Sequence, residues 1–146
     1  VLTNPNNPTG YAIENRKLEE LIKSSNCYFM IDETYVEFSD VDMYSAVNLT
    51  EKCDNLLVIR STSKFFAAAG IRLGYGITGN KKLYVEINKH TNLWNINIFA
   101  DILGGEMFTD TDYHKNVFEF INSEKEKMIS KDSFTFMNTK KYGTSE

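Results

Sequence analysis

The sequence is poor in the features that mark several classes of protein. Only two of its 146 residues are cysteines, Cys27 and Cys53, and their spacing does not suit a metal site. No apolar run approaches the length that spans a bilayer, and no basic and apolar leader opens the chain. Basic residues are scattered, and the net charge is −4, unlike the clustered positive surface of a nucleic-acid binder. We therefore expect a cytoplasmic protein with reduced thiols and with neither nucleic-acid nor membrane partners.

The composition is that of an ordinary globular domain. Apolar residues make up 42% of the chain and charged residues 25%. This length is enough for one domain that buries roughly 70% of its unfolded surface. Because the chain opens at Val1 directly on a strand-like motif, we expect it to be a piece of a longer protein.

Short apolar runs alternate with helical patterns along the first 90 residues. Apolar runs end at polar residues and predict strands at 1–3, 27–31, 55–59 and 72–78. Apolar spacing predicts helices at 15–23, 81–89, 96–108 (interrupted by two glycines) and 112–129. This order predicts an α/β fold with three layers, a mainly parallel sheet covered by helices on both faces. We expect Cys27, at the start of an apolar run, to be buried.

The most informative segment surrounds Lys64. Ser61 and Ser63 precede this lysine, and Arg72 follows eight residues later. Such an amine can form a Schiff base with a phosphorylated aldehyde, while the hydroxyls and the guanidinium bind the phosphate. Ligands of parallel sheets bind beyond the carboxyl ends of the strands, and four polar candidates fall just after a predicted strand: Asn7, Asp32, Ser61 and Lys64.

Four motifs, in the right order, resemble those of the fold-type I aminotransferases of class I/II. Residues 4–10 (Asn-Pro-Asn-Asn-Pro-Thr-Gly) match the family's Asn-Pro-x-Asn-Pro-Thr-Gly, and residues 32–38 match its Asp-Glu-Ala-Tyr-x-Glu-Phe with Thr34 replacing alanine. Residues 63–75 follow its Ser-Lys-x-Phe…Gly-Leu-Arg-x-Gly-Tyr. Residues 94–97 (Trp-Asn-Ile-Asn) resemble an element of members that act on phosphorylated substrates, such as histidinol-phosphate aminotransferases and threonine-phosphate decarboxylases.

The resemblance implies pyridoxal 5′-phosphate (PLP) as the cofactor and a role for each site residue. Lys64 would be the catalytic amine, and Asp32 would hold the proton on the pyridine nitrogen. Tyr35 and Asn7 would hydrogen-bond the phenolic oxygen O3′, and a cis Asn7–Pro8 bond would aim the amide at the ring. The implied phosphate ligands are Ser61, Ser63 and Arg72.

The resemblance also implies a reaction and an organisation. The reaction is transfer of an amino group between an amino acid, phosphorylated or aromatic, and an oxo compound, in an enzyme that is a homodimer. Residues 1–110 would be the central part of the cofactor-binding large domain, 111–130 a helix leading to a small domain, and 131–146 a flexible tail. We expect the 146 residues alone to bind PLP weakly and to be inactive.

Three alternatives remain open at the level of sequence. The same residues suit α-decarboxylation of a phosphorylated amino acid, because transamination and decarboxylation differ in which Cα bond is aligned with the ring. The fold can also serve as a non-catalytic binding domain. Residues 74–79 satisfy the dinucleotide pattern Gly-x-Gly-x-x-Gly, but they lack the apolar strand before the first glycine and a suitably placed acid. His90 and His114 are isolated, and we expect surface positions for both.

Overall fold

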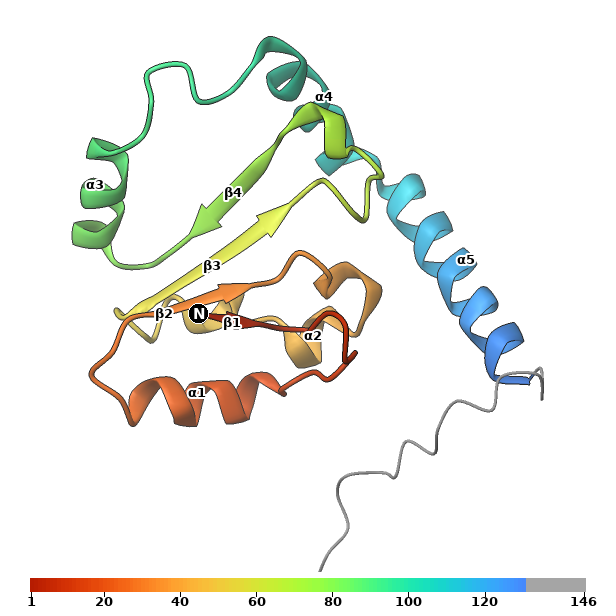
Figure 1. Cartoon of the computed structure of the whole chain (residues 1–146), viewed down its shortest axis with the longest axis horizontal. Helices are drawn as coiled ribbons and strands as arrows, with labels where there is room; N and C mark the ends of the chain where they lie inside the picture. Colours follow the sequence, from red (N-terminus) through yellow and green to blue (C-terminus); the bar gives the residue numbers. More distant parts are fainter. Residues whose placement is uncertain (131–146) are drawn as a thin grey trace, which may run out of the picture. The chain divides into compact units, whose positions relative to one another are not determined.

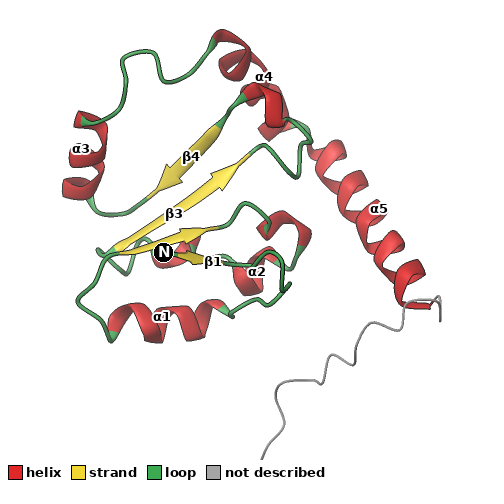
Figure 2. Ribbon diagram, viewed as in Figure 1, coloured by secondary structure: helices red, strands yellow, loops and turns green. Residues whose placement is uncertain are grey.

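The computed structural model describes residues 1–130, in which a four-stranded sheet is the central element (Figures 1 and 2). The strands are β1 (Leu2–Thr3), β2 (Phe29–Asp32), β3 (Leu56–Ser61) and β4 (Gly74–Ile77), in the spatial order β1-β2-β3-β4. The longer helices, of nine residues or more, are α1 (Asn15–Lys23), α3 (Lys81–Lys89), α4 (Ile98–Thr109) and α5 (Thr111–Ser130). The loop after β2 holds α2 (Val41–Tyr44) and the 3₁₀ turns Val36–Phe38 and Val47–Leu49, and a third 3₁₀ turn spans Ala69–Ile71.

The sheet is mixed. Strands β1, β2 and β3 run parallel, whereas β4 is antiparallel to β3. The α/β class is confirmed, and the antiparallel edge has a simple cause. Residues 62–73 form a loop that returns to the same end of the sheet, with only the 3₁₀ turn Ala69–Ile71 and no crossover helix. A parallel pairing needs a crossover that reaches the other end of the sheet.

The hydrophobic core lies between the sheet and α1. Leu18 and Ile22, four residues apart on one face of α1, pack against Ile31, Leu56 and Val58 of the strands. Figure 1 shows α1 and α2 on the same side of the sheet. The segment 46–53 completes this cluster with further buried residues, Ala46, Leu49 and Cys53.

The second strand is shorter and less buried than its sequence suggests. It begins at Phe29, so Cys27 and Tyr28 precede it, and both are exposed. The prediction that Cys27 is buried is therefore wrong. The amide of Cys27 bonds the hydroxyl of Ser25 in the turn after α1, which keeps this residue outside the ladder. Met30 is 37% exposed because it points to the face away from the α1 cluster.

Helix α4 runs without a break through Gly104 and Gly105. Asn97 caps it, accepting a hydrogen bond from the amide of Ala100 while donating to the carbonyl of Ile71. A side chain at Gly104 would come within 2.7 Å of Leu73, so this glycine allows the helix to approach the loop before β4.

The chain divides into two compact units, and the second begins at Thr111. Within the described part of the second unit, α5 runs unbroken over 20 residues, close to the predicted bounds of 112–129. The predicted flexible tail, residues 131–146, lies outside the described residues. No helix among residues 1–130 combines the length and the apolarity needed to cross a membrane.

The contrast between two leucines of α1 tests the core. Leu18 is fully buried, whereas Leu21 is 43% exposed on the same helix. We expect Leu18→Ala to lower the free energy of unfolding by about 3 kcal/mol, since it leaves a cavity among rigid neighbours. Leu21→Ala should cost less than about 1 kcal/mol. Urea denaturation of both variants measures the difference, and equal losses would contradict this packing.

Candidate functional site: the carboxyl edge of the parallel strands

The three parallel strands end at one edge of the sheet. Thr3 pairs with Asp32 and Asp32 with Ile59, so the ends of β1, β2 and β3 lie side by side. The arrowheads of β2 and β3 point to the same edge in Figure 2. The predicted site residues are at the ends of these strands or in the loops that follow, and the fold therefore gathers them at this edge.

Asn7, Tyr35 and Lys64 come together from three different loops. The side-chain amide of Asn7 donates to the hydroxyl of Tyr35 at 3.0 Å. The Nζ atom of Lys64 lies 5.9 Å from the centre of the Tyr35 ring, within the range of a cation–π contact. Lys64 is exposed, so its amine can be reached from solvent. The predicted cis Asn7–Pro8 bond is confirmed, and Asn4–Pro5 is cis as well.

Asp32 is half-buried, and its direction is fixed by its own turn. Its Oδ1 atom accepts hydrogen bonds from the amide of Thr34 at 3.0 Å and from the Thr34 hydroxyl at 2.5 Å. The arrangement is an Asx-turn, in which a carboxylate bonds the backbone two residues ahead. Thr34, which departs from the family's alanine, thus provides a second bond that orients the carboxylate.

The two serines before Lys64 share a hydrogen bond. Their hydroxyl oxygens are 2.6 Å apart, and the amide of Ser63 donates to the Ser61 hydroxyl at 3.1 Å. Thr62, between them, is fully buried, and both its amide and its hydroxyl donate to the carbonyl of Leu73. Ser61 pairs with Gly74 at the end of the β3–β4 ladder, and the bond from the Thr62 amide to the Leu73 carbonyl extends this contact by one residue, up to the neighbour of Arg72.

The side chain of Arg72 bonds within its own loop. Arg72 is exposed, and its guanidinium donates to the carbonyl of Ala69. Its backbone is in the left-handed region with φ of 62°. Ala67, at φ of 50°, is the other non-glycine residue with positive φ among residues 1–130, and both lie in the loop that follows Lys64.

The structure also excludes the other patterns in the sequence. Gly74 and Gly76 lie inside β4 rather than in a turn before a helix, so residues 74–79 do not form a phosphate-binding dinucleotide loop. His90 is exposed and 3.5 Å from Glu86, and His114 contacts the ring of Tyr113. No group of metal-ligating side chains occurs within the described part of the chain.

Sequence reasoning missed a role for Asn4. This side chain is fully buried and accepts a hydrogen bond from the amide of Ile13 while donating to the carbonyls of Ile13 and Tyr44. Its own amide donates to the carbonyl of Asp32. Asn4 therefore fixes both ends of the turn that carries Asn7. A polar residue directly after an apolar strand was the available signal, but the partners could not be read from it.

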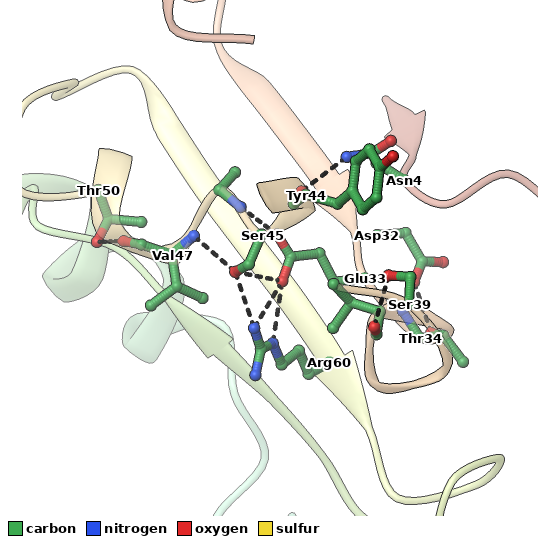
Figure 3. A network of polar contacts seen from close by, with 12 residues as sticks. Asn4, Asp32, Glu33, Thr34, Ser39, Tyr44, Ser45, Val47, Thr50 and Arg60 are labelled. Carbon is green, nitrogen blue, oxygen red and sulfur yellow. Dashed lines mark hydrogen bonds and ion pairs between the residues drawn. The ribbon is translucent and has the colours of Figure 1, made fainter. Parts of the chain in front are cut away.

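Sequence reasoning also missed Glu33, the centre of a buried polar network (Figure 3). Its carboxylate is fully buried and accepts from the Ala46 amide, the Ser45 hydroxyl and Arg60. Arg60 Nε and Nη2 both donate to Glu33 Oε2, at 3.0 and 2.9 Å, and Nη2 also donates to the Ser45 hydroxyl. Each carboxylate oxygen thus has a partner, as a buried charge requires.

Two pKa shifts follow from this network. Burial, the largest influence, lowers the pKa of Arg60, but the charge and the hydrogen bonds of Glu33 outweigh it and raise the pKa above its usual value. Burial raises the pKa of Tyr75, and the neighbouring Arg60 opposes that shift only in part. At neutral pH the network therefore holds a guanidinium cation beside a neutral phenol.

Comparison with known proteins identifies the family of this chain. The sequence model of the family described as "Aminotransferase class I and II" matches residues 1–134. A putative threonine-phosphate decarboxylase of Caldanaerobacter subterraneus subsp. tengcongensis is 39% identical over 133 residues, which cover 88% of this chain and 36% of the relative. The histidinol-phosphate aminotransferase of Clostridium kluyveri is 36% identical over 143 residues, covering 98% of this chain and 39% of the relative.

A solved structure agrees in fold as well as in sequence. The histidinol-phosphate aminotransferase of Clostridium acetobutylicum superposes with a TM-score of 0.79 at 35% identity, over 88% of this chain and 40% of that one. The fold and the site thus define an aminotransferase-type α/β domain. The chain belongs to the aminotransferase class I and II family, and it spans 36–39% of the length of the two curated relatives described above.

Backbone strain at Ala67 can be tested by glycine. Because glycine tolerates positive φ, we expect Ala67→Gly to be neutral or to raise the free energy of unfolding by up to about 1 kcal/mol. Ala68, with φ of −108°, is the matched control. Ala68→Gly should lower the free energy by about 0.5–1 kcal/mol, because it only increases the entropy of the unfolded chain. Urea denaturation decides, and an Ala67→Gly variant less stable than Ala68→Gly would contradict the strain.

The raised pKa of Tyr75 predicts a loss of stability in alkali. In the folded protein Tyr75 keeps its proton above its unfolded pKa of about 10. The stabilisation is therefore complete below that pH and is lost as the pH rises through the folded pKa. Tyr75→Phe cannot lose it, so we expect the free energy of unfolding to fall more steeply above pH 10 in the wild type than in Tyr75→Phe. Parallel pH profiles from urea denaturation would contradict the shift.

Proposed function

We propose that the carboxyl edge of this sheet binds pyridoxal 5′-phosphate and that the whole protein is a PLP-dependent aminotransferase. The observation that carries the proposal is the meeting of three loops, in which Asn7 bonds Tyr35 and the amine of Lys64 lies over the Tyr35 ring. Asp32 and Ser61 end the two neighbouring strands at the same edge. Family membership supports the cofactor, because this family depends on PLP.

The residues present fit the chemistry of the cofactor. PLP carries an aldehyde, a ring nitrogen, a phenolic oxygen and a phosphate, which require an amine, a carboxylate, hydrogen-bonding groups and anion-binding donors. Lys64 provides the amine, Asp32 the carboxylate, Tyr35 and Asn7 the hydrogen-bonding groups, and Ser61, Ser63 and Arg72 the donors to phosphate. The Ser61 and Ser63 oxygens, 2.6 Å apart, can face a single phosphate together.

Each side chain has a defined task in the proposed reaction. When bound, PLP draws electrons away from the substrate Cα, so that one of its bonds can break. Lys64 is the nucleophile that holds the aldehyde and later carries a proton to or from the substrate Cα. Asp32, fixed by Thr34, keeps the proton on the ring nitrogen. Tyr35 and Asn7 hold the phenolic oxygen.

The substrates we propose are an amino acid, phosphorylated or aromatic, and an oxo acid, aldehyde or ketone. A second candidate reaction is α-decarboxylation of a phosphorylated amino acid, favoured by the 39% identity to a putative threonine-phosphate decarboxylase. Both reactions use Lys64, Asp32 and Tyr35 in the same way. The presence of an amine, a carboxylate and a phenol at the same edge of the sheet favours either reaction over a purely non-catalytic binding domain.

The organisation of the whole protein is part of the proposal. Residues 1–110 form the central part of the cofactor-binding domain, and residues 111–130 lead towards a smaller domain, in an enzyme that acts as a homodimer in the cytoplasm. We propose that the 146 residues alone bind PLP weakly and are inactive, since the guanidinium of Arg72 donates to the carbonyl of Ala69 in its own loop and the relatives are more than twice as long.

A cofactor titration tests the proposed function. The whole protein should develop a saturable absorption band near visible wavelengths on addition of PLP, and Lys64→Ala should abolish that band while leaving the fold intact. Lys52→Ala, at an exposed lysine away from the site, is the matched control and should bind as the wild type does. A Lys64→Ala variant that shows the band with unchanged affinity would refute the role of Lys64.

A further inference from the structure

A row of polar residues crosses the sheet directly behind the candidate site. The register pairs Thr3 with Asp32 and Asp32 with Ile59, so the next residues along, Asn4 and Glu33, lie level with Arg60. The amides of Asn4 and Glu33 continue the ladder, donating to the carbonyls of Asp32 and Ile59. Arg60 in turn pairs with Tyr75 of β4. The polar row is thus Asn4, Glu33, Arg60 and Tyr75, one residue from the end of each strand or just beyond it.

The polar row and the candidate site face opposite sides of the sheet. Successive side chains along a strand alternate between the two faces. Glu33 and Arg60 therefore point to the face of the core, whereas their neighbours Asp32 and Ser61 point to the other face. Each member of the row lies within three residues of a proposed cofactor ligand: Asn4 of Asn7, Glu33 of Asp32 and Tyr35, Arg60 of Ser61, and Tyr75 of Arg72.

The polar row also closes the loop that carries Tyr35. The loop of residues 33–46 begins directly after β2. Its far end returns to Glu33, because the Glu33 carboxylate accepts hydrogen bonds from both the Ser45 hydroxyl and the Ala46 amide. Asn4 holds the carbonyl of Tyr44, beside that return point (Figure 3). Arg60 binds Glu33 and Ser45 together, so one guanidinium joins β3 to both ends of the loop.

We propose that Glu33 and Arg60 are positioning residues for the cofactor site. Their ion pair fixes the distance between Asp32 at the end of β2 and Ser61 at the end of β3, and it holds the loop of Tyr35 between them. Neither side chain contacts the cofactor in this account. The proposal rests on the proposed function, since it concerns the geometry of the same site.

The charge and fork geometry of Arg60 make the proposal specific. A lysine keeps the charge but has a single nitrogen, so it cannot reproduce the bonds from both Nε and Nη2 of Arg60 to Glu33 Oε2 together with the bond to Ser45. Arg60→Lys therefore leaves a charge beside Glu33 while it releases the constraint on the loop. Ser45→Ala is a milder variant that removes the three hydrogen bonds of the Ser45 hydroxyl, to Glu33, Arg60 and the Val47 amide, and leaves both charges in place.

The test is the PLP dissociation constant of the whole protein, measured by absorbance well below the unfolding temperature. We expect Arg60→Lys to weaken binding at least tenfold and Ser45→Ala about threefold. Leu18→Ala is the control, because it removes stability from the core without touching the polar row. Leu18→Ala should lower the unfolding temperature at least as much as Arg60→Lys does. It should nevertheless leave the dissociation constant of PLP unchanged.

A second readout separates positioning from stability. The pH midpoint of the absorption change of bound PLP should shift in Arg60→Lys and stay constant in Leu18→Ala. Unchanged affinity and midpoint in Arg60→Lys and Ser45→Ala, both folded, would overturn the positioning role. If the wild type itself shows no saturable PLP binding, it is the proposed function that fails. Should Arg60→Lys not fold, Ser45→Ala with wild-type affinity alone overturns the proposal.

Discussion

The parallel register of β1, β2 and β3 is the constraint on which the rest of the structure depends. It aligns Thr3, Asp32 and Ile59 across the sheet, and alternation along each strand then assigns neighbours to opposite faces. Asp32 and Ser61 face the candidate site, while Glu33 and Arg60 face the core. A shift of one residue between β2 and β3 would exchange these roles, moving Asp32 towards the core and Glu33 away from Arg60.

The buried ion pair between Glu33 and Arg60 favours this register over a shifted one. Glu33 is fully buried with hydrogen bonds to both oxygens, so a slipped pairing would leave a charge without compensation. Hydrophobic packing between α1 and the strands stabilises the fold but is tolerant of small shifts, whereas the bonds of Arg60 are directional. Stability and geometry thus come from different sets of residues on the same face of the sheet.

Much of this could be predicted from the sequence, since it depends on local patterns. Helices α1 and α3 follow from apolar spacing at the predicted bounds, and the polar residues after each strand indicated the edge where Asn7, Tyr35 and Lys64 meet. What the sequence did not reveal depends on partners far away along the chain. The antiparallel pairing of β4, the exposure of Cys27 and the buried roles of Asn4 and Glu33 are set by tertiary contacts, which spacing alone does not show.

The central claim is that one lysine at the carboxyl edge of the sheet is the amine that takes up the cofactor aldehyde. The most direct measurement is peptide mapping by mass spectrometry, after the protein has been mixed with limiting PLP and reduced with borohydride. The account predicts that the pyridoxyl mass is found on the peptide containing Lys64, ahead of exposed lysines such as Lys52 and Lys81. Modification spread evenly over the exposed lysines, with Lys64 not preferred, would contradict it.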